Sequence, residues 1–475
     1  ISSAGLLTKT NHVFKSFPTN LPFLVFQISL NLGELSMSKI KILIFSLGLL
    51  CGTFVWAQNK RPNFILIMAD DLGIGDLGVY GSKLINTPNL DRMAAEGIVF
   101  DSFYASANVC TASRGGLLTG RYPIRLGLVD DVARPTNDIH LAETEITIAE
   151  ALKGEGYNTA IFGKWHLGSR VEWYPLNHGF DEFYGALHSN DMAPFQLYRD
   201  NQIIEDPVDQ TTLTQRYTSE ALRFIEKNKD NPFFLYIPHS FPHVPLFVTE
   251  EFEGQSSAGL YGDVVETIDW SMGQILEKLN ELGIDENTMV IFTSDNGPWF
   301  EGSSGQFRNR KGTSWEGGLR VPFIARWPST IPRNQRNSHA AMNIDVLPTI
   351  LDFAGVSLST ETPPDGRSLR GVLTNGEGSP HDYLYLFNND RIAAVRSGKW
   401  KLVVETFYRT GVPSFDNPNS YYAPNGLLFD LEKDPSENYS FTREYPEVAE
   451  ALHSQLIKGQ KALDSKVLPN MFNRL

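Results

Sequence analysis

Short apolar segments rich in β-branched and aromatic residues alternate with amphipathic segments along most of this chain, and this alternation is what most constrains its fold. The pattern predicts buried strands at residues 63–68, 158–162, 233–237 and 289–292. It predicts helices at residues 87–96, 147–153, 215–228 and 261–282. Strands that alternate with helices indicate an α/β fold, in which helices sandwich a large and mostly parallel sheet.

The pattern changes near residue 380. Short strands are predicted at residues 393–396 and 400–404, Asn425-Gly426 is a turn signal, and a last helix is predicted at about residues 446–463. We therefore expect a large domain over residues 58–379. A smaller C-terminal α+β subdomain with an antiparallel sheet should follow over residues 380–475.

Residues 37–57 have the features of a secretory signal peptide. Lys39 and Lys41 precede an apolar run at residues 42–51, and a cleavage point is expected after Ala57. The run is too short to serve as a permanent membrane span. We expect residues 1–57 to comprise an upstream segment and this signal peptide, and the mature protein to be secreted or periplasmic.

The charge balance limits the classes of partner. The chain carries 41 basic and 55 acidic residues, a net charge of −14. A negatively charged surface repels nucleic acids, so we expect no nucleic-acid partner. An anionic substrate would need a locally basic pocket.

Acidic residues follow two of the predicted strands at their carboxyl ends. Asp70 and Asp71 follow the first strand, and Asp295 and Asn296 follow the strand at residues 289–292. The carboxyl ends of parallel strands form the ligand crevice of open α/β sheets. Three carboxylates and an amide gathered there favour a hard cation, calcium first and magnesium second. For either pair alone, a turn or helix cap is an equal alternative.

Cationic groups follow other predicted strands or lie in a glycine-rich loop. Lys164 and His166 come after the strand at residues 158–162, His239 and His243 come after the strand at 233–237, and Lys311 lies in a glycine-rich stretch. A lone lysine or histidine is more often solvated or packed. Several at such positions indicate an anion site.

Cys110 is the only cysteine outside the expected leader, which contains Cys51. It begins the run Cys-Thr-Ala-Ser-Arg-Gly-Gly-Leu-Leu-Thr-Gly-Arg at residues 110–121. A lone buried structural thiol is the alternative. The run resembles the signature of the formylglycine-dependent, arylsulfatase-like sulfatases of the alkaline phosphatase superfamily. Residues 163–168, Gly-Lys-Trp-His-Leu-Gly, also match that family, and the resemblance extends over most of residues 62–440. Ala112 replaces the usual proline of the signature.

The resemblance implies the chemistry of a sulfuric ester hydrolase. Cys110 would be oxidised to formylglycine by a maturase, and its hydrate would attack the sulfur of a sulfated carbohydrate or aryl sulfate. One calcium ion would be held by Asp70, Asp71, Asp295, Asn296 and residue 110. His166 would assist the release of sulfate, and His243 with Lys311 would protonate the leaving oxygen. Arg114 and Lys164 would hold the nucleophile and the sulfate oxygens, Ser189 would contact sulfate, and His239 is a further candidate for substrate contact.

The loop at residues 298–310 joins the expected metal ligands to Lys311. Trp299 and Phe300 could stack on a sugar, and Arg308 or Arg310 could pair with a second sulfate or a carboxylate. An equal alternative is that the aromatic rings pack the loop and the arginines are solvated. Two other functions stay open: a phosphomonoesterase or phosphodiesterase on the same fold, and a non-catalytic glycan-binding relative.

Overall fold

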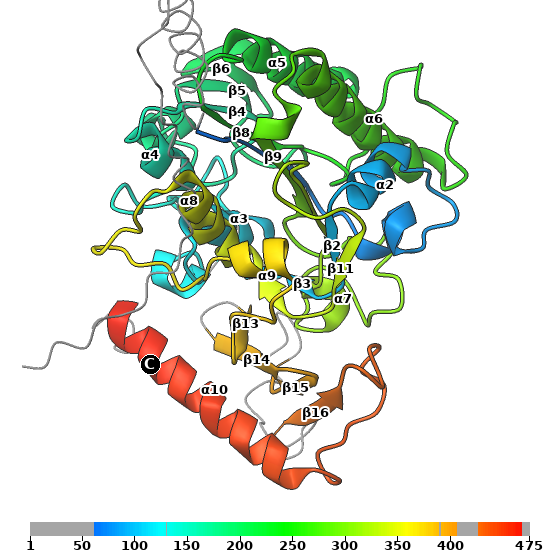
Figure 1. Cartoon of the computed structure of the whole chain (residues 1–475), viewed down its shortest axis with the longest axis vertical. Coiled ribbons are helices and arrows are strands. Elements are labelled where there is room, and N and C mark those ends of the chain that lie inside the picture. Colours follow the sequence, from blue (N-terminus) through cyan, green and yellow to red (C-terminus); the bar gives the residue numbers. More distant parts are fainter. Residues whose placement is uncertain (1–60, 130, 389–390, 406–425, 468–475) are drawn as a thin grey trace, which may run out of the picture. The chain divides into compact units, whose positions relative to one another are not determined.

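A ten-stranded sheet forms the centre of the computed structural model, which describes residues 61–129, 131–388, 391–405 and 426–467 (Figure 1). The strands follow the order β11-β2-β10-β9-β1-β8-β4-β5-β6-β7. Their bounds are β1 Asn63–Ala69, β2 Ile98–Phe100, β4 Asn158–Lys164, β5 Glu182–Ala186, β6 Leu197–Arg199, β7 Gln202–Glu205, β8 Phe233–Pro238, β9 Thr288–Ser294, β10 Phe323–Arg326 and β11 Gln335–Asn337. A separate pair joins β3 Phe103–Tyr104 to β12 Ala341–Met342.

Five neighbouring strands at the centre of this sheet, β9, β1, β8, β4 and β5, run parallel. Every residue of β1 is buried, as expected for a strand covered on both faces. Among the outer strands, β10, β6 and β7 pair antiparallel to their neighbours. The sheet is therefore mixed and mostly parallel.

Helices cover both faces of the sheet, and each face has its own apolar core (Figure 1). One core includes residues of α2, α5 and α6, and the other includes residues of α3, α4 and α8. The helices are α2 Pro88–Ala95, α3 Cys110–Thr119, α4 Ile148–Lys153, α5 Leu213–Lys227, α6 Gly259–Glu281, α7 Glu316–Leu319, α8 Val346–Ala354 and α9 Arg370–Asn375. Local sequence explains where several begin: Thr147 and Glu150, for example, form a capping box at the start of α4.

A four-stranded antiparallel sheet follows in the C-terminal part, with order β13-β14-β15-β16. Its elements are β13 Leu384–Asn388, β14 Arg391–Ser397, β15 Trp400–Val403, β16 Leu427–Asp430 and the helix α10 Pro446–Val467. A third apolar core joins this sheet and α10 to Trp315 and Leu319 of the larger part. The boundary at residues 379 and 380 stays a prediction.

The predicted fold class is confirmed. The four strands and four helices that were predicted for the large domain are also confirmed, with ends that differ by a few residues. The expected signal peptide and the Asn425 half of the turn signal lie outside the described residues. Among the helices of the described part, none is both long and apolar enough to cross a membrane.

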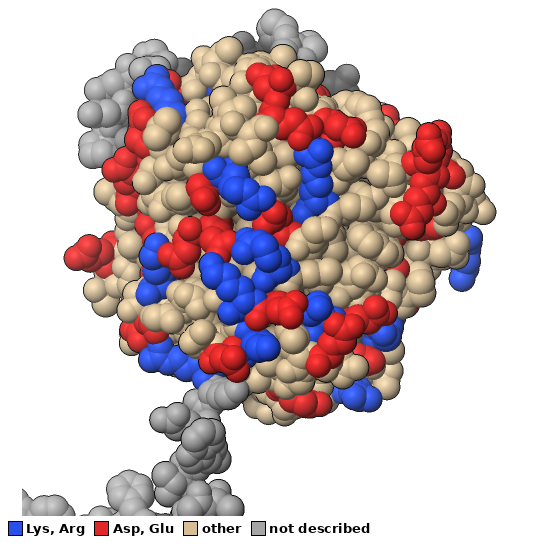
Figure 2. Space-filling model, turned by 90° about the horizontal axis from the view of Figure 1, so that it is seen from above, with Lys and Arg blue, Asp and Glu red and all other residues tan. Residues whose placement is uncertain are grey.

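Acidic and basic side chains are intermixed on the face that Figure 2 shows. Ion pairs join a number of surface side chains in the described part of the chain. Glu182, for example, contacts Arg223 and lies 2.7 Å from the ammonium of Lys227. Such exposed pairs contribute about 0–1 kcal/mol each, so they affect solubility more than folding.

Candidate active site

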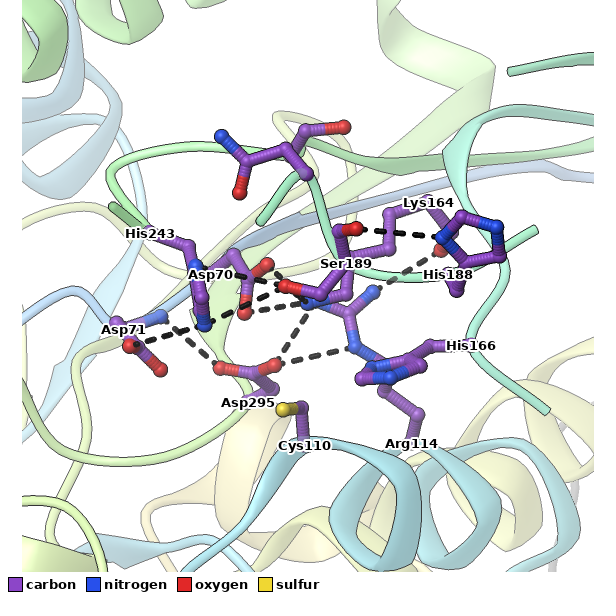
Figure 3. A network of polar contacts seen from close by, with 12 residues as sticks. Asp70, Asp71, Cys110, Arg114, Lys164, His166, His188, Ser189, His243 and Asp295 are labelled. Carbon is purple, nitrogen blue, oxygen red and sulfur yellow. Dashed lines mark hydrogen bonds and ion pairs between the residues drawn. The ribbon is translucent and has the colours of Figure 1, made fainter. Parts of the chain in front are cut away.

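The carboxyl ends of the five central parallel strands bring most of the predicted site residues to one edge of the sheet (Figure 3). Asp70 follows β1 and Asp295 follows β9, while Lys164 is the last residue of β4. His243 follows β8, and Ser189 follows β5. These residues are separated by up to 225 positions in sequence and meet because parallel strands end on the same side.

Cys110 is the first residue of helix α3 and is 3% exposed. Ser113 donates the first helical hydrogen bond, to the carbonyl of Val109 at 3.1 Å. The N–H groups of residues 110–112 therefore precede the helical ladder, where they favour negative charge. Burial raises the pKa of the Cys110 thiol, although Lys311 and Lys164 act against this shift.

Arg114 lies one helical turn after Cys110 and is fully buried. Its Nε and Nη2 donate to Asp295 Oδ2 at 3.1 and 2.8 Å, and Nη2 lies 3.3 Å from Asp70 Oδ1. A third donor, Nη1, reaches the carbonyl of Lys164 at 3.1 Å. The guanidinium thus joins the ends of β1, β4 and β9.

The two buried carboxylates have opposite pKa shifts. Burial alone would raise the pKa of Asp70, but Lys164 and Arg114 outweigh it and hold that pKa well below its usual range. Burial and the nearby Asp70 carboxylate raise the pKa of Asp295, and Arg114 offsets only part of the shift. Carboxylates this close resist being ionised together, so an added cation would stabilise the site.

The buried side chains of Asp70, Cys110 and Asp295 could hold a metal ion. One ligand atom each of Asp70, Cys110 and Asp295 can be chosen so that all lie within 4.8 Å of one another. Asp70 Oδ1 and Asn296 Oδ1 are buried and accept no hydrogen bond. The Asn296 amide instead donates through Nδ2 to Asp71 Oδ1 at 2.7 Å, so its carbonyl oxygen is unused. Buried oxygens that accept no hydrogen bond cost free energy, and a cation bound at the site would offset this cost.

Lys311 and His243 both approach Asp71, and Lys311 also contacts the Cys110 thiol. Lys311 Nζ donates to Asp71 Oδ2 at 2.9 Å and lies 3.7 Å from Cys110 Sγ. Burial alone would lower the pKa of Lys311, but Asp71 outweighs burial and keeps the ammonium charged. His243 Nδ1 lies 2.6 Å from the carbonyl of Val244, and since a carbonyl only accepts, Nδ1 carries a proton. His243 Nε2 faces Asp71 Oδ2 at 3.8 Å.

Lys164 and His166 come from the end of β4. Gly163 lets this segment lie against β8: its φ is 138°, and a Cβ there would be 1.9 Å from the carbonyl oxygen of Pro238. Lys164 contacts Asp70 and donates to Ser189 Oγ at 3.2 Å. His166 is fully buried, and neither ring nitrogen has a hydrogen-bond partner. Burial, together with Lys164 and Arg114, lowers its pKa well below the usual range.

A cavity of about 290 Å³ lies over these groups. Five predicted site residues line it: Cys110, His166, Ser189, His243 and Lys311. Its other lining residues are Val109, Asp131, Val132, Arg134, Asp191 and Met192. Four of these residues could not be predicted from the sequence, because no motif or predicted strand end marks Asp131, Arg134, Asp191 and Met192.

Three predicted substrate contacts are not among the lining residues. His239 is buried, with its ring centroid 6.4 Å from that of Tyr217. Arg308 lies over the ring of Trp315 at 4.0 Å and donates to the Glu437 carbonyl at 2.9 Å. Arg310 donates to the carbonyls of Trp299, at 2.9 Å, and Gly302. In this structure both arginines therefore support their own loop.

Comparison with known proteins gives one consistent result. The family model described as Sulfatase matches residues 62–356, and one described as N-sulphoglucosamine sulphohydrolase, C-terminal, matches residues 302–462. Steryl-sulfatase of Rattus norvegicus is 33% identical, over 89% of this chain and 91% of its own length. N-acetylgalactosamine-6-sulfatase of Sus scrofa is 36% identical, over 88% of each chain.

A solved structure agrees with these matches. It comes from work on the metabolism of multiple glycosaminoglycans by Bacteroides thetaiotaomicron, and it superimposes with a TM-score of 0.76 at 26% identity. The match covers 85% of this chain and 100% of that chain. The expected alkaline phosphatase-like architecture is thereby confirmed.

Proposed function

The chain belongs to the sulfatase family and is a sulfuric ester hydrolase, and on that premise we propose that it desulfates carbohydrates with a formylglycine at residue 110 and one calcium ion. The observation that carries the proposal is the position of Cys110. It begins helix α3 beside two buried carboxylates and Lys311, and it lines the cavity above them.

Residue 110 is suited to conversion into formylglycine. Cys110 is a free thiol, and it begins the sulfatase-like run of residues 110–121. As formylglycine, it would supply a hydrated aldehyde with one hydroxyl to attack sulfur and a second whose deprotonation drives the release of sulfate. A maturase that accepts Cys-Thr-Ala-Ser-Arg is the partner that this proposal requires.

Calcium is the metal that the donor set favours. Asp70, Asp71, Asp295 and Asn296 would hold it together with an oxygen of the modified residue 110. All-oxygen ligation without histidine suits a hard cation. The ion would supply positive charge beside the sulfate oxygens.

The chain's own cations fix and neutralise the sulfate group. Lys164 lies between Asp70 and Ser189, and Arg114 is locked by Asp295, so both donors are placed before substrate arrives. Fixed donors stabilise the charge that develops on the transferring group because they need no reorganisation.

Two histidines face the cavity and are placed to move protons. The Val244 carbonyl accepts the Nδ1 proton of His243. The Nε2 atom would therefore hold the proton that is delivered to the leaving oxygen, and Lys311 would assist it. His166 has two unpartnered nitrogens, and one of them would accept the proton whose removal releases sulfate.

A carbohydrate substrate is supported by the rim of the cavity and by the relatives. Asp131, Arg134 and Asp191 can exchange hydrogen bonds with hydroxyl groups, and Met192 adds an apolar contact. Relatives that cover most of this chain include a sulfatase named for N-acetylgalactosamine and a structure from glycosaminoglycan metabolism. We also propose that the mature protein is secreted or periplasmic and has the domain boundaries predicted from sequence.

The test uses protein co-produced with a formylglycine-generating enzyme, with its mass measured at residue 110. An aryl sulfate should be hydrolysed much faster than the matching aryl phosphate, and sulfated monosaccharides should be desulfated. Matched Cys110→Ser protein should be inactive. Preference for the phosphate would favour the phosphoesterase alternative. Binding of sulfated sugars without turnover by formylglycine-containing protein would favour the glycan-binding alternative.

A further inference from the structure

The segment that carries Lys311 runs from residue 308 to the start of α7 and is held from two sides. On one side, the N–H of Gly312 donates to the carbonyl of Asn108 at 3.0 Å, two residues before Cys110. The N–H of Lys311 itself donates to the carbonyl of Pro298 at 3.0 Å. On the other side, two buried charged residues of the C-terminal part, Lys401 and Glu437, contact the segment.

Lys401 extends from β15 and is fully buried. Its ammonium donates to the carbonyl of Ser314 at 3.0 Å and to Glu316 Oε1 at 2.9 Å. It also lies 2.8 Å from Glu437 Oε1. One cation therefore contacts the backbone three residues after Lys311 and the first residue of α7.

Glu437 lies in the loop between β16 and α10 and also contacts the segment that carries Lys311. Its Oε2 accepts the N–H of Glu316 at 2.7 Å, and its carbonyl accepts Arg308 Nη1 at 2.9 Å. Glu437 is fully buried and has a φ of 52°, an uncommon conformation for a residue other than glycine. The same loop also contacts the chain just before the segment, since Ser436 Oγ donates to the carbonyl of Gln306 at 2.6 Å.

Charge compensation makes this arrangement rigid. Arg320 lies 2.7 Å from Glu316 Oε2, and Tyr104 donates to the same oxygen at 2.7 Å. Each glutamate thus faces at least one buried cation. Removing one member of such a buried network leaves a charge without a partner, so the network tolerates little displacement.

Close packing also holds the backbone around Lys311 in place. The Gly317 N–H donates to the carbonyl of Arg308 at 2.8 Å, so the segment closes on itself around Lys311. A Cβ at Gly317 would lie 2.2 Å from the carbonyl oxygen of Asn309. The long Lys311 side chain can reach Asp71 and Cys110 only if its own backbone stays in place.

We infer that Lys401 and Glu437 are positioning residues for Lys311. Through these two residues, the C-terminal part of the chain affects the rate of turnover. This inference rests on the proposed catalytic role of Lys311. Neither residue lines the substrate cavity, so their effect should fall on turnover and leave substrate binding nearly unchanged.

The experiment compares Glu437→Gln and Lys401→Met with Lys311→Ala in formylglycine-containing enzyme, using a small aryl sulfate. Each positioning variant should lower kcat roughly 10- to 100-fold, as expected for a displaced catalytic group, while KM changes by less than about threefold. Lys401→Arg should recover part of the loss. Combining Glu437→Gln with Lys311→Ala should cost no more than Lys311→Ala alone, since the two changes remove the same interaction.

The matched control is Leu452→Ala in α10, which removes buried apolar volume from the C-terminal core and takes no part in the polar contacts described above. The inference is overturned if this control loses as much kcat at an equal loss of Tm, or if the double variant shows additive losses. It is also overturned if Glu437→Gln and Lys401→Met both keep the normal kcat while Lys311→Ala does not. If Lys401→Met does not fold, the Glu437→Gln cycle decides. Normal turnover by Lys311→Ala would instead refute the proposed role of Lys311, and the inference with it.

Discussion

At the scale of single residues, the site depends on buried groups whose charges are matched by close partners. Arg114 and Lys164 are fully buried, and both reach Asp70. The two ring nitrogens of His166 have no hydrogen-bond partner, and Cys110 contacts Lys311 through its thiol. Stability alone does not explain such an arrangement, because buried charges and unpaired polar atoms cost free energy.

Replacing Cys110 by alanine should abolish sulfatase turnover and change the free energy of unfolding by about 1 kcal/mol or less. The side chain is small, and its role is chemical. Kinetics with an aryl sulfate and a thermal unfolding curve check both parts. Residual turnover near that of the unsubstituted enzyme would show that residue 110 is not the nucleophile.

His178 gives a prediction about acid stability. It is fully buried, both ring nitrogens lack a partner, and burial lowers its pKa to about 4. Between pH 6.5 and 4 the unfolded chain binds a proton that the folded chain does not, so stability falls as pH falls. The full contribution is about 3 kcal/mol.

The His178 ring lies 5.4 Å from the ring of Trp165, between centroids. The variant His178→Phe should remove the pH-dependent contribution and keep this ring contact. Urea unfolding at several pH values should therefore give a flatter dependence between pH 6.5 and 4 than that of the unsubstituted protein. Parallel curves for the two proteins would mean that His178 does not titrate as its burial indicates.

At the scale of elements, the loop between β9 and α7 combines a fixed end with an exposed middle. Arg310 is tied to the carbonyls of Trp299 and Gly302, and Lys311 is bonded to Asp71. Phe300 remains 70% exposed and Trp299 39% exposed, with their rings 4.9 Å apart. Exposed aromatic rings on the loop that leads to Lys311 would be available to a bound sugar chain.

Replacing Phe300 by alanine should raise KM for a sulfated oligosaccharide about fivefold, an energy of about 1 kcal/mol. The kcat and KM for a small aryl sulfate should stay nearly constant, since Phe300 does not line the cavity. Ile203→Ala is a control of similar kind, because this side chain is 51% exposed on the outer strand β7. Equal effects on both substrates would place Phe300 in the support of the loop instead.

At the scale of the whole molecule, the parallel centre of the sheet collects groups from five strands, and the C-terminal sheet holds the segment that carries Lys311. A metal ion bound by the carboxylates at these strand ends would join β1 to β9, which are hydrogen-bonded neighbours. Its removal should therefore affect stability as well as activity.

Exhaustive chelation should lower both Tm and turnover, and calcium should restore both. At free calcium a hundredfold above Kd the expected stabilisation is about 3 kcal/mol. Asp295→Ala should lose the response of Tm to calcium. Full activity after chelation, or stoichiometric zinc by elemental analysis, would contradict the assignment.

Much of the fold follows from local pattern. Buried strands such as Asn63–Ala69 and Thr288–Ser294 have continuous apolar sequences bounded by polar residues, which fixes their extent and favours a sheet covered on both faces. Asp70 and Asp295 could be placed together for the same reason, because parallel strands end at one edge. The antiparallel pairing of β10 could not be predicted, since strand direction depends on how the chain returns to the sheet.

Only the tertiary structure decided which side chains face the cavity. His239 and His243 are four residues apart, yet only His243 lines it, because side-chain direction after a strand depends on the path of the loop. Asp131 and Asp191 line the cavity from irregular segments that carry no periodic signal. The contacts of Lys401 with Glu316 and Glu437 join residues distant in sequence. Sequence by itself determined the chemistry available to this protein, because residue types and local periodicity are local properties. The folded chain decided which groups act together, because burial and long-range contacts exist only after folding.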